Sequence, residues 1–171
     1  VRIVVMGDSN SDGAGADTEN LTYNSLLYQN DSEAWPEFDE HDLTGFYPSL
    51  VEVYDVAVGG ATTSSLVNDQ LPAAASELGD SVEGETIVIM TISGNDVNAA
   101  VTQLWYLLEV TNDPEAADEV VAELIARVGQ NIETIIDFYD DPVRFPDGAY
   151  IYMANVYDPT DGTGDLPACY P

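Results

Sequence analysis

The sequence contains no lysine, and its only positively charged residues are Arg2, Arg127 and Arg144. Thirty-two Asp and Glu residues face these three arginines, which gives a formal net charge of −29 over 171 residues. Such a surface repels phosphate backbones and anionic lipid head groups, so we expect neither nucleic acid nor an anionic membrane as a partner. The charge also destabilises the folded chain by self-repulsion unless salt screens it. We interpret it as adaptation to a saline setting; acidity that serves solubility or calcium binding is the alternative.

Cysteine is nearly absent, and long apolar runs are missing. Cys169 is the only cysteine, and it lies close to the last residue. A lone cysteine in a secreted protein indicates a missing partner or a free thiol. The sequence begins at Val1 rather than Met, so either a leader has been removed or the sequence has been trimmed. No apolar run is long enough to cross a bilayer. We expect a secreted or periplasmic protein.

Apolar residues make up 45% of the chain, which suffices for one domain with a core, and we expect a single domain over residues 1–171. Apolar runs predict strands at residues 2–6, 53–58, 86–92 and 149–155. Helices are predicted at residues 18–29, 72–78 and 114–139. The longest helix has Asp113 as its cap and Pro114 at its first position. Its apolar stripe consists of Val121, Leu124, Ile125, Val128, Ile132, Ile135, Ile136 and Tyr139.

Strands that are apolar on both faces and alternate with helices are typical of a parallel sheet with helices on each side. The predicted fold class is therefore α/β, a three-layer α/β/α sandwich. Ligands of such sheets bind at the carboxyl ends of the strands. Each predicted strand ends in a polar turn: GDSNSDG, GGATTSS, SGNDVN and NVYDPTDG. We expect these turns to bring Ser9, Gly60, Asn95 and Asn155 to one edge of the sheet.

Three of these turns resemble the sequence blocks of the SGNH/GDSL hydrolases, a family of esterases and lipases. The blocks are Gly7-Asp8-Ser9-Asn10, with Asn10 where leucine often stands, then residues 58–63 (VGGATT) and residues 93–96 (SGND). Each block is short, but the three occur in order, each after its own strand. The resemblance covers residues 2 to about 155 and implies a parallel, flavodoxin-like sheet.

The resemblance also implies the roles of three residues. The Ser9 hydroxyl would attack an ester carbonyl. The backbone N–H groups of Ser9 and Gly60 and the side-chain amide of Asn95 would stabilise the oxyanion, and one such donor is typically worth about 3 kcal/mol. Each residue also has a plainer interpretation. Ser9 could cap the following helix, Gly60 could serve a turn, and Asn95 could hold its own loop.

The histidine that should activate the serine does not match the family pattern. In the family, the base is the histidine of an Asp-x-x-His block near the C-terminus. The one histidine here is His41, in the sequence Asp39-Glu40-His41-Asp42. We interpret His41 as a solvated loop residue.

The sequence also ends soon after the fourth predicted strand. Together with the unpaired Cys169, this leads us to expect the N-terminal portion of a longer protein. A C-terminal segment or a second chain would then carry the Asp-x-x-His block. If the sequence is complete, we expect a weak or inactive hydrolase.

The acidic segment at residues 158–165 (DPTDGTGD) carries Asp158, Asp161 and Asp165 around two glycines. Closely spaced carboxylates on a turning backbone suit calcium, although the spacing is not that of an EF-hand. We therefore consider these three residues as ligands of a structural calcium ion. The predicted chemistry requires no cofactor.

The sequence thus predicts an ester hydrolase that acts through an acyl-enzyme on Ser9. Its substrate would be a small-molecule ester: an acyl ester, a lysophospholipid-like lipid or an acetylated sugar. One alternative is a catalytically silent domain that uses the same pocket to bind a carbohydrate or another ligand. A second alternative, a flavodoxin-like cofactor or signalling domain, is disfavoured because the first turn is not a phosphate loop.

Overall fold

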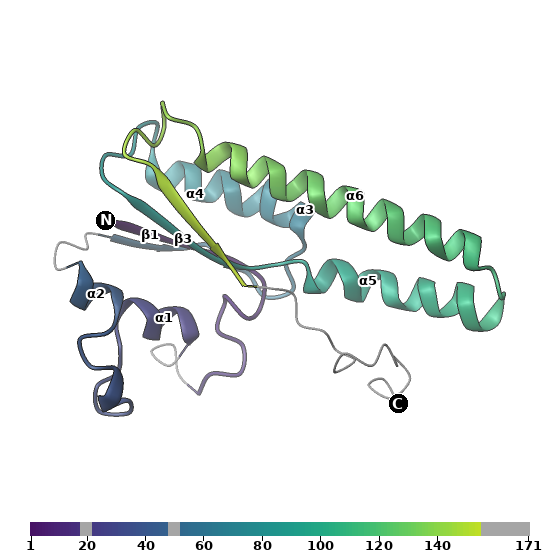
Figure 1. The fold of residues 1–171 in the computed structure, drawn as a ribbon, viewed down its shortest axis with the longest axis horizontal. Coiled ribbons are helices and arrows are strands. Elements are labelled where there is room, and N and C mark those ends of the chain that lie inside the picture. The colour runs from purple at the N-terminus through teal and green to yellow at the C-terminus, as the bar shows by residue number, and fades with distance from the viewer. Residues whose placement is uncertain (18–21, 48–51, 155–171) are drawn as a thin grey trace.

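Four parallel strands form the centre of the computed structural model, which describes residues 1–17, 22–47 and 52–154. The strands are β1 (Arg2–Gly7), β2 (Glu52–Asp55), β3 (Thr86–Thr91) and β4 (Ala149–Met153), in the spatial order β2-β1-β3-β4. Figure 1 shows the strands running in one direction, with α3 and α5 starting at their carboxyl ends. This edge of the sheet is where a parallel α/β fold places a ligand.

Helices of very different lengths surround the sheet. The α-helices are α1 (Tyr23–Tyr28), α2 (Leu43–Phe46), α3 (Thr63–Ser65), α4 (Leu71–Leu78), α5 (Gly94–Trp105) and α6 (Pro114–Tyr139). A 3₁₀ turn, η2, covers Pro36–Phe38. Two π-helical turns, η3 (Leu66–Gln70) and η4 (Tyr106–Val110), continue α3 and α5. No helix among the described residues is long and apolar enough to span a bilayer.

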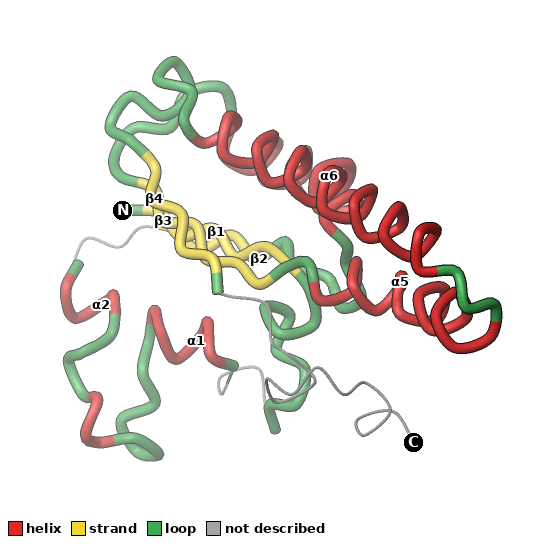
Figure 2. Tube along the Cα trace, turned by 45° about the vertical axis from the view of Figure 1, so that its right-hand side comes forward, coloured by secondary structure: helices red, strands yellow, loops and turns green. Residues whose placement is uncertain are grey.

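Side chains alternate between the two faces of the sheet and form two cores. Val4 and Met6 of β1 lie in the larger core, with Leu66 of η3 and with Ile135 and Tyr139 of α6. On the other face, Ile3, Val5, Ile87 and Ile89 form a smaller core, against which Tyr28 of α1 and Leu43 of α2 pack. Figure 2 shows the two helical layers on opposite sides of the strands. The predicted three-layer α/β/α sandwich is confirmed.

The predicted long helix is confirmed in full. It covers Pro114–Tyr139, with Pro114 at its start and the Asp113 carboxylate accepting a hydrogen bond from Ala116 N–H at 3.1 Å. Its predicted apolar stripe is only partly buried: Ile135 and Tyr139 are in the core, whereas Val121, Ile125 and Ile136 are exposed. The first half of the helix extends past the sheet beside α5, so it has no sheet to cover (Figure 1).

The sequence prediction was less accurate around the shorter helices. The described part of the first helix begins at Tyr23, because the Thr22 hydroxyl caps it by accepting from Ser25 N–H at 3.1 Å. Residues 63–70, which lie outside the predicted helices, form α3 and η3 directly before α4. Helix α5 and the turn η4 were not predicted. The N-cap of α5, Ser93, has a left-handed conformation and makes no side-chain cap bond, although Ser is a usual residue at a helix start.

Candidate active site

The Ser9 turn follows β1 directly and is held by a buried carboxylate. Asp8 is buried, and its Oδ1 accepts hydrogen bonds from Thr91 Oγ1 at 2.7 Å and from Asn10 N–H at 3.0 Å. The Ser9 carbonyl accepts from Ala14 N–H at 2.7 Å, and the Ser9 side chain is half-buried. Ser9 does not cap the following helix, because Thr22 does so. The plainer interpretation of Ser9 as a helix cap is therefore wrong.

Hydrogen bonds between hydroxyl groups anchor this turn to β3. The fully buried Ser11 Oγ lies 2.9 Å from Thr91 Oγ1 and 3.0 Å from the Tyr23 hydroxyl, and it accepts from Thr91 N–H at 2.9 Å. Asn24 Nδ2 donates to the Ser11 carbonyl at 3.0 Å. These bonds give the buried side chains of Ser11 and Asn24 hydrogen-bond partners within the chain. The turn after β1 is thus fixed to the end of β3 and to the start of α1.

The second predicted block lies against the Ser9 turn. Gly59 N–H donates to Asp12 Oδ2 at 3.0 Å, and a Cβ added to Gly59 would lie 3.9 Å from Ser9 Cβ. Gly60 has φ +82°, a left-handed conformation that strongly favours glycine, while an added Cβ there would meet no described atom within 4 Å. Gly60 therefore does serve a turn, as its plainer interpretation has it. It exposes the backbone of this loop beside Ser9.

The third block touches both other turns. Asn95 lies in the first turn of α5, and its Nδ2 donates to the Ala61 carbonyl at 2.9 Å. This bond reaches another loop, so the role of Asn95 is not limited to holding its own loop. An amide NH₂ group has two hydrogens, and a single bond of this kind uses one of them. A Cβ added to Gly94 would lie 3.8 Å from Asp8 Oδ2. Hydrogen bonds therefore join the second loop to each of the other two turns, and Gly94 of the third block lies close to Asp8 of the first.

A buried glutamine side chain completes the end of β1. Gln70, at the end of the π-helical turn η3, is 3% exposed. Its Oε1 accepts from Gly7 N–H at 2.8 Å, and its Nε2 donates to the Gly7 carbonyl at 2.8 Å. Gln70 thereby pairs with β1 beyond the point where β2 ends at Asp55. It fixes the backbone two residues before Ser9.

Several of these residues carry no clear signal in the sequence. Ser11 and Gln70 are polar residues that only the fold shows to be buried, and Thr91 is a polar residue at the end of an apolar strand. Asp8 and Asp96 could have been considered, since each adjoins a predicted site residue. A π-helical turn such as η3 often marks a functional site, but the sequence alone does not reveal one.

The chain's one histidine lies in another part of the fold. His41 is exposed and directly precedes Asp42, the residue that caps α2. Helix α2 lies toward the amino ends of the strands, whereas the Ser9 turn follows the carboxyl end of β1 (Figure 1). Asn155, Cys169 and the predicted calcium ligands Asp158, Asp161 and Asp165 lie outside the described residues. Within the described ranges, no group of three or more His, Cys, Asp or Glu side chains could hold a metal ion.

Comparison with known proteins gives a family match over most of the chain. The family described as "GDSL-like Lipase/Acylhydrolase" matches residues 3–160. No curated protein sequence matches the chain.

Three solved structures resemble the chain at low sequence identity and low TM-score. They are an extracellular lipase from Streptomyces rimosus (19% identity, TM-score 0.41, 90% of this chain), a phospholipase A1 from Streptomyces albidoflavus NA297 (21%, 0.44, 89%) and an acetyl xylan esterase from Geobacillus stearothermophilus (16%, 0.35, 88%). The chain spans 58% of the length of each of these structures. On the strength of the family match over most of its length, the chain belongs to the GDSL-like lipase/acylhydrolase family.

Proposed function

We propose that this protein is a serine ester hydrolase that forms an acyl-enzyme on Ser9. Membership of a lipase/acylhydrolase family supports ester hydrolysis in general. The observation that carries the finer proposal is the contact of the three turns. Gly59 lies beside Ser9, Gly94 beside Asp8, and the Asn95 amide donates to Ala61 at 2.9 Å.

In the proposed reaction, Ser9 Oγ attacks the ester carbonyl and the carbonyl oxygen becomes an oxyanion. The backbone N–H groups of Ser9 and Gly60 and the second amide hydrogen of Asn95 donate to it. Donors that are already held in place need no reorganisation when the charge develops. The oxyanion then collapses, the ester C–O bond breaks, and the leaving oxygen takes up the proton that the base removed from Ser9. Water next hydrolyses the Ser9 ester, which releases the acid and restores the Ser9 hydroxyl. The site requires no cofactor for these steps.

Both the first attack and the hydrolysis of the acyl-enzyme need a base. His41 adjoins the cap of α2 rather than the Ser9 turn, so we propose that this chain does not supply the base itself. A further segment or a second chain would supply it. General-base assistance is typically worth about 10²- to 10⁴-fold in rate, so we expect faint turnover by the 171-residue chain.

The shape of the surface near Tyr23 supports an acyl ester as substrate. A hollow of about 450 Å³ is lined by Tyr23, Ile89, Met90, Ile151, Tyr152, Met153 and Ala154. Most of these side chains are apolar, and the Tyr23 hydroxyl lies 3.0 Å from Ser11 Oγ in the turn that carries Ser9. An apolar acyl group fits this lining better than a sugar does. We also propose a secreted or periplasmic location.

The experiment is chemical rescue of the missing base. Turnover of p-nitrophenyl butyrate is measured for the wild type and for Ser9→Ala, with and without imidazole. We expect imidazole to accelerate the wild type above the solution reaction, with no such gain for Ser9→Ala. His41→Ala should behave like the wild type. Equal rates for wild type and Ser9→Ala at every imidazole concentration would refute the proposal.

The same result would favour the second candidate function, a silent ligand-binding domain. The observation in its favour is the position of the one histidine, which adjoins α2. A silent domain would bind an ester or carbohydrate near Ser9 without ever modifying the serine.

A further inference from the structure

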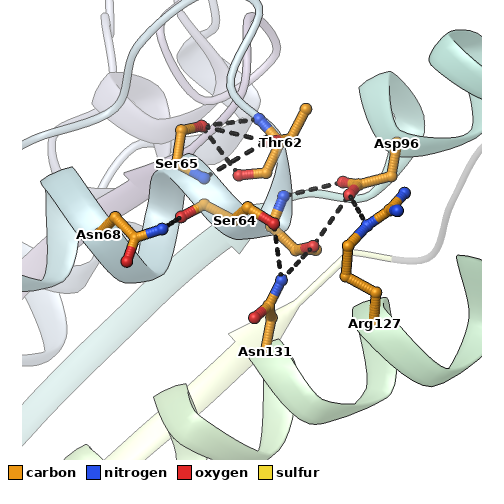
Figure 3. Close-up of polar contacts among 8 residues, drawn as sticks. Thr62, Ser64, Ser65, Asn68, Asp96, Arg127 and Asn131 are labelled. Atoms are coloured by element: carbon orange, nitrogen blue, oxygen red, sulfur yellow. Dashed lines mark hydrogen bonds and ion pairs between the residues drawn. The ribbon is translucent and has the colours of Figure 1, made fainter.

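A buried carboxylate next to Asn95 ties together two parts of the proposed site. Asp96 is 2% exposed and lies in the first turn of α5. Its Oδ2 accepts from Thr63 N–H at 2.8 Å, and its Oδ1 accepts from Thr63 Oγ1 at 2.9 Å. Thr63 is fully buried and begins α3, directly after the loop that carries Gly60. Two hydrogen bonds therefore join that loop to the helix that carries Asn95 (Figure 3).

Helix α6 supports the same contact from a third direction. Asn131 Nδ2 donates to Thr63 Oγ1 at 3.0 Å and to Ser64 Oγ at 3.1 Å. Arg127 Nε lies 4.0 Å from Asp96 Oδ1. One of only three arginines in the sequence thus faces this carboxylate. Figure 3 shows Asp96, Arg127 and Asn131 converging on the start of α3. A buried charge needs such partners, because its desolvation is costly.

Capping of α3 does not by itself explain Asp96. The Thr62 hydroxyl already accepts from Ser65 N–H at 3.3 Å, and Ser65 Oγ accepts from Thr62 N–H at 2.8 Å. This capping box is complete without the carboxylate. The bonds from Asp96 add a link between two elements that lie more than thirty residues apart in the sequence. Asn95 makes a parallel link to Ala61 at 2.9 Å.

We propose that Asp96 and Thr63 are positioning residues that set the distance between two oxyanion donors, Gly60 N–H and the Asn95 amide. Arg127 and Asn131 hold this pair from α6. The inference rests on the proposed function, because it assigns the contact a role in the reaction. The two donors come from different loops, so only a fixed contact between these loops keeps them aimed at one point.

The test compares Thr63→Val, which removes the hydroxyl, with Thr63→Ser, which keeps it, and with Asp96→Asn. The rates are measured with imidazole present. We expect Thr63→Val and Asp96→Asn to lower kcat by about 10- to 100-fold with little change in KM, and Thr63→Ser to stay near the wild type. A thionoester is measured as well, because its sulfur is a poor hydrogen-bond acceptor. A displaced oxyanion donor slows the oxygen ester more than the thionoester. The rate for the oxygen ester divided by the rate for the thionoester should therefore fall in Thr63→Val and Asp96→Asn.

Two exposed residues of α6 provide matched controls. Thr134→Val is the control for Thr63→Val, because it removes a hydroxyl whose hydrogen bond goes only to a backbone carbonyl of the same helix. Asp118→Asn is the control for Asp96→Asn, because it removes an exposed carboxylate. Both should keep the wild-type rates and rate ratio. Thr63→Val or Asp96→Asn with a folded chain, an unchanged kcat and an unchanged rate ratio would overturn the inference and leave the proposed function standing.

Hydrogen exchange separates the inference from the proposed function. Asp96→Asn should speed amide exchange in residues 59–66 and leave residues 114–139 unchanged. If Ser9→Ala shows that the chain has no serine-dependent turnover, the proposed function fails. Faster exchange in residues 59–66 would then still support the positioning contact, and unchanged exchange would overturn it.

Discussion

Replacing Gln70 by leucine should cost a large part of the stability of this fold. The side-chain amide of Gln70 accepts from Gly7 N–H and donates to the Gly7 carbonyl, both at 2.8 Å, and it is 3% exposed. Leucine has a similar size but no polar group. In Gln70→Leu, Gly7 N–H loses this partner in a buried place, which costs about 1–3 kcal/mol. The carbonyl keeps the bond from Val58 N–H at 3.1 Å, so its loss is smaller, about 1 kcal/mol.

The expected loss is therefore about 2–4 kcal/mol, which is a large fraction of the stability of a small domain. Urea unfolding at constant molar salt measures it, with circular dichroism as the signal. The midpoint should fall by about 1 M or more, given the usual urea dependence of small proteins. Gln103→Leu, on the exposed side of α5, is the matched control and should stay within about 0.5 kcal/mol of the wild type. If Gln70→Leu is as stable as Gln103→Leu, our account of the end of β1 is wrong.

Three further predictions concern stability. The melting temperature should rise from low to molar sodium chloride, because the screening length falls from about 10 Å at 0.1 M to about 3 Å at 1 M; a flat or falling value, with a chelator present to exclude bound calcium, would contradict the saline interpretation. Gly7→Ala should fold poorly, since Gly7 has φ +123° and an added Cβ would overlap a carbonyl oxygen of β3, whereas Gly129→Ala has open space in α6 and should be stabilising by about 0.5–1 kcal/mol. Partial removal from water raises the pKa of Asp42, but hydrogen bonds from the N–H groups of Asn30 and Gly45 outweigh this and lower it below its ordinary value. The carboxylate therefore contributes stability above its unfolded-state pKa of about 3.9, and this is lost as pH falls through the lower folded-state pKa. Asp42→Asn should lose less stability than the wild type in an acid titration of unfolding, and parallel losses would refute the assignment.

The sequence predicted the sheet and the longest helix well, for physical reasons. The strands β1 and β3 are uninterrupted apolar runs, which only a sheet covered on both faces can bury. Asp113 and Pro114 mark the start of α6 without ambiguity. Helix α5 was not predicted because SGNDVN was interpreted only as the turn after a strand, although Ser93 and Asp96 have the residue types and spacing of a helix start. The exposure of Ile125 was also missed, because periodicity identifies an apolar face but not how far a sheet extends beneath it.

Only the site residues that directly follow a strand could be predicted from the sequence. Ser9, Gly60 and Asn95 each stand in a turn at the carboxyl end of a parallel strand, so topology alone brings these turns together. Gln70 and Thr63 support them from other elements, and nothing in their local sequence distinguishes them from surface residues. Their role depends on burial, which is a property of the whole fold.

The central claim is that Ser9 is the nucleophile, and covalent labelling tests it most directly. The full chain is incubated with a fluorophosphonate in molar salt with imidazole, and the modified residue is located by mass spectrometry of its peptides. Our account predicts a single adduct on Ser9, which Ser9→Ala abolishes and His41→Ala leaves in place. An adduct on another residue, or equal labelling of wild type and Ser9→Ala, would contradict it.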